Sequence, residues 1–100
     1  QYDELIAGQD GNFEWITGDE RDPCMLCYTS GTTGHPKGVL YQHRSTMLHA
    51  MAEVAPSIFD LSTTSALLPI VPMFHAASWG LPFAGALAGV KFVFSTTNEA

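Results

Sequence analysis

The chain has 100 residues, with four Lys and Arg against ten Asp and Glu, and a formal net charge of −6. This acidic balance argues against nucleic acid as a partner, because phosphate-backbone binding needs a basic patch. Charged residues make up 14% of the sequence, against about 25% in an ordinary globular protein, and none falls between Asp60 and Lys91. We therefore expect an interior part of a much larger protein; the alternative is a small, unusually apolar domain complete in itself.

The uncharged stretch does not fit a membrane span, which needs about twenty consecutive apolar residues that can stay helical. Pro69, Pro72 and Pro82 interrupt it, and His75 and several Ser and Thr residues dilute it. The first residues also lack the basic region and the cleavage pattern of a signal peptide. The sequence predicts a soluble, cytoplasmic protein without a transmembrane segment.

Residues 1–23 are predicted to be an acidic connecting segment, rich in turn-forming residues, with a short helix at 2–7. Residues 25–29 form a continuous apolar run, which predicts a strand buried on both faces. Cys24 and Cys27 form a C-x-x-C pattern there, but no second pair of metal ligands and no helix start accompany it. We expect two buried thiols in a reducing compartment, without chemistry of their own.

Residues 28–39, Tyr-Thr-Ser-Gly-Thr-Thr-Gly-His-Pro-Lys-Gly-Val, form a loop rich in glycine and hydroxyl groups, with a second strand predicted at 38–42. Glycine lets backbone N–H groups turn inward onto an anion, and hydroxyls add rotatable donors. Lys37 supplies one full positive charge. The loop is therefore a candidate phosphate site, although its spacing excludes the Walker and dinucleotide patterns. The alternative is a flexible Gly/Thr hairpin turn.

The rest of the chain alternates between helix and strand patterns. Residues 44–55 predict a helix that ends before Pro56 and whose apolar residues share one face, namely Met47, Leu48, Met51, Val54 and Ala55. Strands are predicted at 66–71 and 91–95, and a tightly packed helix at 76–88 that Pro82 either bends or starts. This alternation predicts an α/β fold with a mainly parallel sheet and helical crossovers.

A second motif, Val-Pro-Met-Phe-His over residues 71–75 followed by Ala-Ala-Ser-Trp, combines a strand end, a proline-fixed turn and aromatic side chains. His75 and Trp79 are spaced like neighbours on one helical face. With Phe74 they can wall an apolar pocket at the carboxyl end of a parallel sheet, where ligands bind in open α/β folds. The alternative is ordinary packing of a histidine beside a tryptophan.

Together, the loop at 28–39 and the Pro-x-Phe-His turn resemble the motifs of the adenylate-forming (AMP-binding) superfamily. Segments 40–44 and 48–50 are similar to those of medium- and long-chain fatty acyl-CoA ligases, a branch that includes 3-methylthiopropanoate-CoA ligases. The resemblance implies that residues 24–100 are part of the large N-terminal domain of such an enzyme. The phosphate loop is then 28–39, and the substrate-side turn is 71–79.

The resemblance implies a reaction in two steps. Carboxylate and ATP give acyl-AMP and pyrophosphate, and the thiol of coenzyme A then displaces AMP. The groups implied to hold ATP are Thr29, Ser30, Gly31, Thr32, Thr33, Gly34 and Lys37. Lys37 and His75 have catalytic roles, and the acid is bordered by Phe74, His75 and Trp79, with Trp79 as a gate to the acyl tunnel. His43 and His49 are interpreted as packing or surface residues.

The implied cofactors are ATP, coenzyme A as co-substrate, and Mg²⁺. The metal ligand, the ribose-binding aspartate and the catalytic lysine are all expected outside this chain, so the chain alone should be inactive. The substrate is a small carboxylic acid, fatty or short and thio-substituted, and a homodimer is one alternative for the oligomeric state. Other readings are an adenylation domain that loads a carrier protein, a nucleotide-binding module without ligase activity, and a structural α/β fragment with a fortuitous loop.

Overall fold

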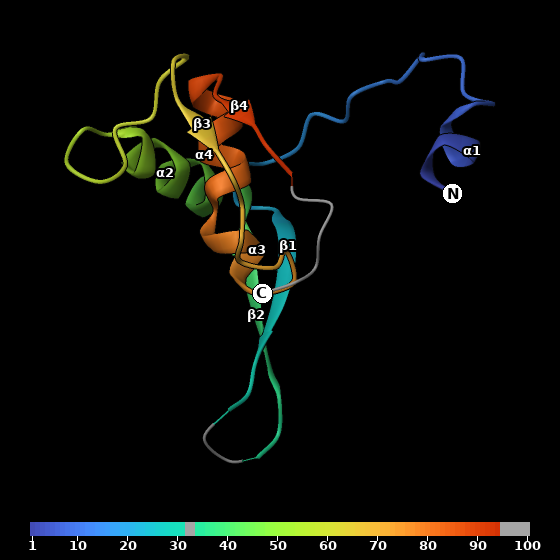
Figure 1. The fold of residues 1–100 in the computed structure, drawn as a ribbon. Coiled ribbons are helices and arrows are strands. Elements are labelled where there is room, and N and C mark those ends of the chain that lie inside the picture. Colours follow the sequence, from blue (N-terminus) through green and yellow to red (C-terminus); the bar gives the residue numbers. More distant parts are fainter. Residues whose placement is uncertain (32–33, 95–100) are drawn as a thin grey trace.

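The computed structural model describes residues 1–31 and 34–94, whose arrangement Figure 1 shows. In chain order the elements are α1 (Tyr2–Ile6), β1 (Pro23–Thr29), β2 (Lys37–Gln42), α2 (His43–Val54), β3 (Ala66–Leu67), α3 (Ala76–Trp79), α4 (Leu81–Ala88) and β4 (Lys91–Phe92). Each predicted helix and strand has a counterpart at its predicted place. The α/β class is therefore confirmed.

The strands β1 and β2 form an antiparallel hairpin around the candidate phosphate loop, with Thr29 opposite Lys37 and Cys27 opposite Val39. The expected parallel arrangement does not apply to this pair, because a short loop joins antiparallel neighbours whereas parallel strands need a long crossover. The expected burial of β1 on both faces is wrong. The hairpin extends away from the helices (Figure 1), and only Cys27 of β1 is buried.

The strands β3 and β4 do pair in parallel, and α3 and α4 form the crossover between them. Ala66 stands opposite Lys91, and Leu67 opposite Phe92. Both strands are shorter than predicted. For β3 the reason is the proline at position 69, which cannot donate a backbone hydrogen bond to extend the pairing. Ser95, the predicted end of the last strand, lies outside the described residues.

The core lies where α2 packs against α4. Ala50 of α2 is 2% exposed and Ala84 of α4 is fully buried, so the contact is made by small residues that allow close approach. The prediction that the apolar face of α2 is buried is wrong for Met47 and Leu48, which are both more than half exposed. The buried face is instead the one that carries Ala50 and Glu53.

The helix predicted at 76–88 is divided into two by Gly80. Residues 76–79 all have positive φ, from +46° at Ala76 to +60° at Trp79, so α3 is a left-handed turn. Pro82 lies in the first turn of α4 and marks the start of that helix, as predicted. A left-handed residue other than glycine costs roughly 1–2 kcal/mol, so contacts from outside the turn must hold α3. One of these is the hydrogen bond of 2.6 Å that the Ser78 hydroxyl donates to the backbone oxygen of Val71.

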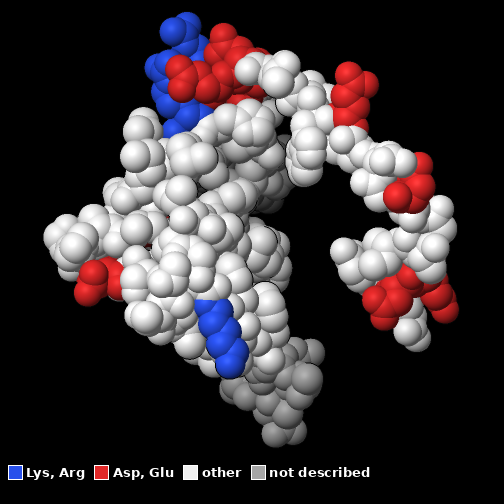
Figure 2. Space-filling model, turned by 90° about the horizontal axis from the view of Figure 1, so that it is seen from above, with Lys and Arg blue, Asp and Glu red and all other residues white. Residues whose placement is uncertain are grey.

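The N-terminal segment stands apart from the body. Helix α1 has no buried residue and lies at the far end of an extended stretch (Figure 1). Figure 2 shows acidic side chains spread along one arm and a cluster of both signs at another corner of the molecule. An ion pair joins Glu20 to Arg44 at the start of α2, and the Arg44 guanidinium lowers the pKa of Glu20. None of the helices within 1–31 and 34–94 is long and apolar enough to cross a membrane.

Candidate active site

The turn of the hairpin depends on two glycines in the left-handed region of backbone space. Gly31 has φ +64° and Gly34 has φ +82°, values that residues with side chains rarely adopt. A Cβ atom at Gly31 would also overlap with the backbone oxygen of His35 and would lie 3.7 Å from Cγ of Lys37. The loop backbone thus folds back on itself at Gly31, and the stem of Lys37 lies against this turn.

Lys37 occupies the position at which β2 begins, directly opposite Thr29. The Thr29 hydroxyl donates a hydrogen bond of 3.5 Å to the backbone oxygen of Lys37. Because side chains alternate between the two faces of a strand, Lys37 belongs to the same face as Val39 and Tyr41. A single positive charge therefore stands at the loop end of this face of the hairpin.

A cavity of about 310 Å³ brings the loop together with the second motif. Ser30 of the loop and His75 of the Pro-x-Phe-His turn both line it, although they are far apart in the sequence. The other lining residues come mostly from one face of the hairpin and are Cys27, Tyr28, Thr29, Val39, Tyr41 and Ala76. Hydroxyl donors and an imidazole thus converge on one concave site, an arrangement suited to a ligand with anionic groups.

Trp79 lines a different cavity, of about 450 Å³, together with Met25, Phe59 and Phe83. The two cavities are neighbours, because Tyr41 and Ala76 line both. The expectation that His75 and Trp79 lie on one helical face assumed a right-handed helix. The left-handed turn of α3 directs the two side chains into adjacent cavities instead.

The predicted site residues therefore differ in where they lie in the structure. The shared cavity unites Thr29, Ser30 and His75. The hairpin turn beside it holds Gly31, Gly34 and Lys37. Phe74 is 82% exposed and lines neither cavity. Thr32 and Thr33, predicted to donate to phosphate as well, lie outside the described residues.

Sequence reasoning missed a polar pair in the cavity of Trp79. His49 and Glu53, one turn apart on α2, approach within 3.3 Å between Nε2 and Oε1. The same His49 nitrogen lies 3.0 Å from the backbone oxygen of Trp79. Glu53 is only 4% exposed, and burial raises the pKa of its carboxyl group while His49 partly offsets this. The spacing of a histidine four residues before a glutamate was the available signal, but such pairs are also common on helix surfaces.

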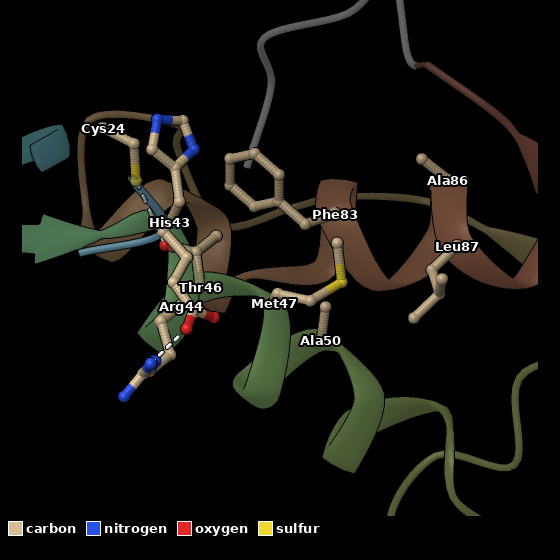
Figure 3. Close-up of a pocket in the computed structure, with 10 residues that line it drawn as sticks. Cys24, His43, Arg44, Thr46, Met47, Ala50, Phe83, Ala86 and Leu87 are labelled. Atoms are coloured by element: carbon tan, nitrogen blue, oxygen red, sulfur yellow. Dashed lines mark hydrogen bonds and ion pairs between the residues drawn. The ribbon is translucent and has the colours of Figure 1, made fainter. Parts of the chain in front are cut away.

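A further cavity, of about 660 Å³, lies between α2 and α4 and contains none of the predicted site residues (Figure 3). Met47 of α2 lies opposite Phe83 and Leu87 of α4 across it, and Cys24 lies at one end. Cys24 is exposed, so the prediction of two buried thiols holds only for Cys27. The strand pairing is irregular between residues 23 and 25, and residues three apart in a strand point to opposite faces.

No group of three or more His, Cys, Asp or Glu side chains that could hold a metal ion occurs in the described part of the chain. The hydroxyls, the loop glycines and Lys37 fit a polyanionic ligand.

The chain belongs to the AMP-binding enzyme family, whose model matches residues 3–100. It is 51% identical over 92 residues to the medium-chain-fatty-acid–CoA ligase of Ectopseudomonas oleovorans. The matched region covers 92% of this chain and 17% of that protein. It is equally identical, with the same coverage, to the 3-methylmercaptopropionyl-CoA ligase of Ruegeria lacuscaerulensis. The chain thus spans about one sixth of the length of these curated relatives.

Solved structures support the fold. The chain matches the N-terminal domain of FACL13 from Mycobacterium tuberculosis with a TM-score of 0.81 and 26% identity, over 98% of this chain and 24% of that one. It matches ATP-bound MatB from Rhodopseudomonas palustris with a TM-score of 0.80 and 22% identity, over 92% and 18% of the two chains. The architecture is therefore that of part of the N-terminal domain of an adenylate-forming enzyme.

The buried carboxyl group of Glu53 predicts a pH dependence of stability. Because its pKa is raised in the folded state, its contribution is fully present below the ordinary pKa of a glutamate and is lost as pH rises through the raised value. We expect Glu53→Gln, which cannot ionise, to lose less stability than the wild type between pH 4 and pH 8. Urea unfolding of the full-length protein at several pH values measures this difference. Parallel pH profiles for the two proteins would contradict the assignment.

Proposed function

We propose that this chain is the phosphate-loop part of an AMP-forming acyl-CoA ligase. The observation that supports the proposal is the cavity lined by both Ser30 and His75, because a hydroxyl donor suits a phosphate and an imidazole suits a carboxylate. The identity to two CoA ligases supports the same reaction class. In the full-length protein, a carboxylic acid and ATP would give acyl-AMP and pyrophosphate, and coenzyme A would then displace AMP.

In the first step the acid's carboxylate oxygen attacks the α-phosphorus of ATP and the bond to the β-phosphate breaks. Negative charge develops on the departing pyrophosphate, so the step needs donors and positive charge that are already in position. Backbone N–H groups of the turn, the Ser30 hydroxyl and the charge of Lys37 would meet this need, and the Thr29 hydroxyl would join them by leaving the backbone oxygen of Lys37 to which it donates. We assign the binding and charge stabilisation of the leaving pyrophosphate to the hairpin loop.

The acid would span the two neighbouring cavities. His75 would orient its carboxylate in the cavity that also contains Ser30, and Trp79 would shape the acyl part from the adjacent cavity. That adjacent cavity is lined mainly by apolar and aromatic side chains, with the His49–Glu53 pair among them, and a mainly apolar lining fits a fatty acid or a short thio-substituted acid. These are the kinds of acid that the names of the two relatives indicate.

The remaining parts of the reaction belong to the rest of the protein. Mg²⁺ would supply further charge neutralisation on the ATP phosphates, held by a ligand outside this chain, and the catalytic lysine and the ribose-binding aspartate would also lie outside it. The chain alone would then be inactive. We place the full-length enzyme in the cytoplasm, with a homodimer as one of the assemblies to be tested by light scattering.

The full-length protein tests the proposal directly. It should exchange radiolabelled pyrophosphate into ATP in the presence of acids, and should form acyl-CoA when coenzyme A is added. A series of straight-chain acids of increasing length, together with 3-methylthiopropanoate, would define the substrate. Failure to exchange pyrophosphate with any of these acids would count against the proposed reaction.

The acceptor distinguishes the proposal from its nearest alternative. An adenylation domain that loads a carrier protein would exchange pyrophosphate but would form no acyl-CoA with free coenzyme A. A nucleotide-binding module without ligase activity would be stabilised by ATP against thermal unfolding but would not exchange pyrophosphate. The identity to CoA ligases favours coenzyme A as the acceptor.

Replacement of Trp79 by alanine should change the preference among acids. Removing the indole enlarges the apolar cavity, so the ratio of kcat/KM between longer and shorter acids should rise by roughly tenfold, the scale of one or two methylene groups in an apolar pocket. Trp15, the other tryptophan of the chain, is 83% exposed on the N-terminal segment, so Trp15→Ala is the matched control. An acid profile of Trp79→Ala that equals the wild-type profile would remove Trp79 from the selection of the acid.

A further inference from the structure

The left-handed turn α3 needs support that its own sequence does not provide. Four consecutive residues other than glycine, 76–79, have positive φ before Gly80 continues the same conformation at +82°. For L-amino acids this conformation is unfavourable at each position, and strain of this kind persists only where the surrounding structure holds it. The turn carries Trp79 and directly follows His75, so whatever supports it also positions both side chains.

His49 of α2 supplies one such contact. Its Nε2 atom lies 3.0 Å from the backbone oxygen of Trp79, the last residue of the turn. A carbonyl oxygen can only accept a hydrogen bond, so Nε2 must carry the proton and donate it. The imidazole thus ties the end of α3 to a helix that is distant in the sequence.

Glu53 lies next to the same nitrogen of His49. Its Oε1 atom is 3.3 Å from Nε2 of His49, and its side chain is 5% exposed. The second carboxyl oxygen, Oε2, is buried without a hydrogen-bond partner among the described residues. A carboxyl group is costly to bury with one oxygen unpaired, and its position beside His49 and the turn indicates a role in the site.

Gly80 provides the space in which these groups meet. A Cβ atom at Gly80 would lie 2.6 Å from Cδ2 of His49 and 3.0 Å from Oε2 of Glu53. Any side chain there would push the imidazole and the carboxyl group away from the turn. The glycine therefore serves both the left-handed backbone and the close approach of the pair.

We propose that His49 and Glu53 are positioning residues that clamp the left-handed turn 76–79. They would thereby determine where Trp79 lies in the cavity of about 450 Å³ that it lines. The two residues act on the selection of the acid through the backbone of Trp79 and touch no reacting atom. This role in selection rests on the proposed acyl-CoA ligase function. The contact of His49 and Glu53 with the turn can be tested without an enzyme assay.

The structural part is tested by amide hydrogen exchange in the full-length protein. The amides of Ser78 and Gly80 donate hydrogen bonds within the turn, to His75 and Ala77. We expect His49→Ala to speed their exchange by about two- to tenfold, the effect of losing one hydrogen bond. His49→Gln, whose amide can donate to the same carbonyl, should restore much of the protection. His43→Ala removes an imidazole from the start of the same helix and should have no effect; unchanged exchange in His49→Ala would overturn the clamp.

A glycine pair provides a second test that leaves His49 and Glu53 intact. Gly80 and Gly89 flank α4 and both have positive φ, but a Cβ at Gly89 meets only Cγ2 of Thr63, at 3.5 Å. Gly80→Ala and Gly89→Ala therefore introduce similar backbone strain, and only the first displaces the clamp. Exchange at Ser78 should accelerate in Gly80→Ala beyond its rate in Gly89→Ala. Equal exchange in the two variants would contradict the clamp.

A double-mutant cycle tests the role in acid selection. If His49 acts through Trp79, His49→Ala should shift the kcat/KM ratio between long and short acids in the direction of Trp79→Ala, and the double variant should match Trp79→Ala alone. Independent, multiplicative shifts would overturn the positioning role. If no acid supports acyl-CoA formation, the proposed function and the selection role both fail, while the exchange data still decide the clamp.

Discussion

Lys37→Ala in the full-length protein is expected to slow acyl-AMP formation by roughly 10²–10³-fold, the usual effect of removing one donor that stabilises developing charge. Lys37 stands at the loop end of the hairpin face that lines the cavity of Ser30 and His75, and its stem lies against Gly31. In the proposed reaction its charge would act on the departing pyrophosphate, so the loss should fall on the rate of adenylation and much less on the affinity for the acid.

The ATP–pyrophosphate exchange rate measures this effect, and acid affinity comes from equilibrium titration. Lys91, the other lysine of the chain, belongs to β4 and lines none of the cavities described here. Lys91→Ala therefore controls for the loss of a positive charge in general. Equal exchange rates for Lys37→Ala and the wild type would refute the assignment of Lys37 to the leaving group.

Gly31→Ala should be the second most damaging change, and Gly34→Ala should be milder. Both positions have positive φ, so each alanine adds backbone strain of roughly 1–2 kcal/mol. At Gly31 the new methyl group would also collide with the backbone oxygen of His35, whereas at Gly34 no atom of residues 1–31 or 34–94 lies within 4 Å of it. The loop of Gly31→Ala must therefore change shape, which would weaken the phosphate binding that we propose for it.

Kinetics at varied ATP concentration distinguish the two variants. We expect the KM for ATP to rise by more than about tenfold in Gly31→Ala, since a displaced loop loses at least one charge-assisted hydrogen bond. The change in Gly34→Ala should be smaller. Thermal unfolding of both proteins shows whether the fold survives. Similar ATP kinetics for the two variants would mean that the close approach at Gly31 has no part in holding ATP.

The order of elements was predictable because its signals are local. Apolar runs at the two strands of the hairpin, glycines between them and the proline at position 82 each act within a few residues. Burial was not predictable in this way. The pattern of α2 favoured Met47 and Leu48 as the buried face, but the residues of α2 that are buried are Ala50 and Glu53.

The site was predictable to the extent that its residues belong to motifs. The loop and His75 were identified from their motifs, and the structure places Ser30 and His75 on one cavity. The left-handed turn was not foreseen, because alanine, serine and tryptophan carry no preference for positive φ. Without that turn, His49 had no visible partner, and His75 and Trp79 were expected on one helical face, whereas they line neighbouring cavities.

The two residues that line both cavities have a consequence for ligands that would occupy both spaces. Tyr41 and Ala76 border the space beside the phosphate loop and the space beside Trp79. A ligand that displaces the tyrosine ring from one space narrows the other. Occupancy of the two spaces is then thermodynamically linked, and each ligand changes the affinity of the other by the same factor. Through the ring of Tyr41, the proposed nucleotide and acid would each change the binding affinity of the other before the reaction begins.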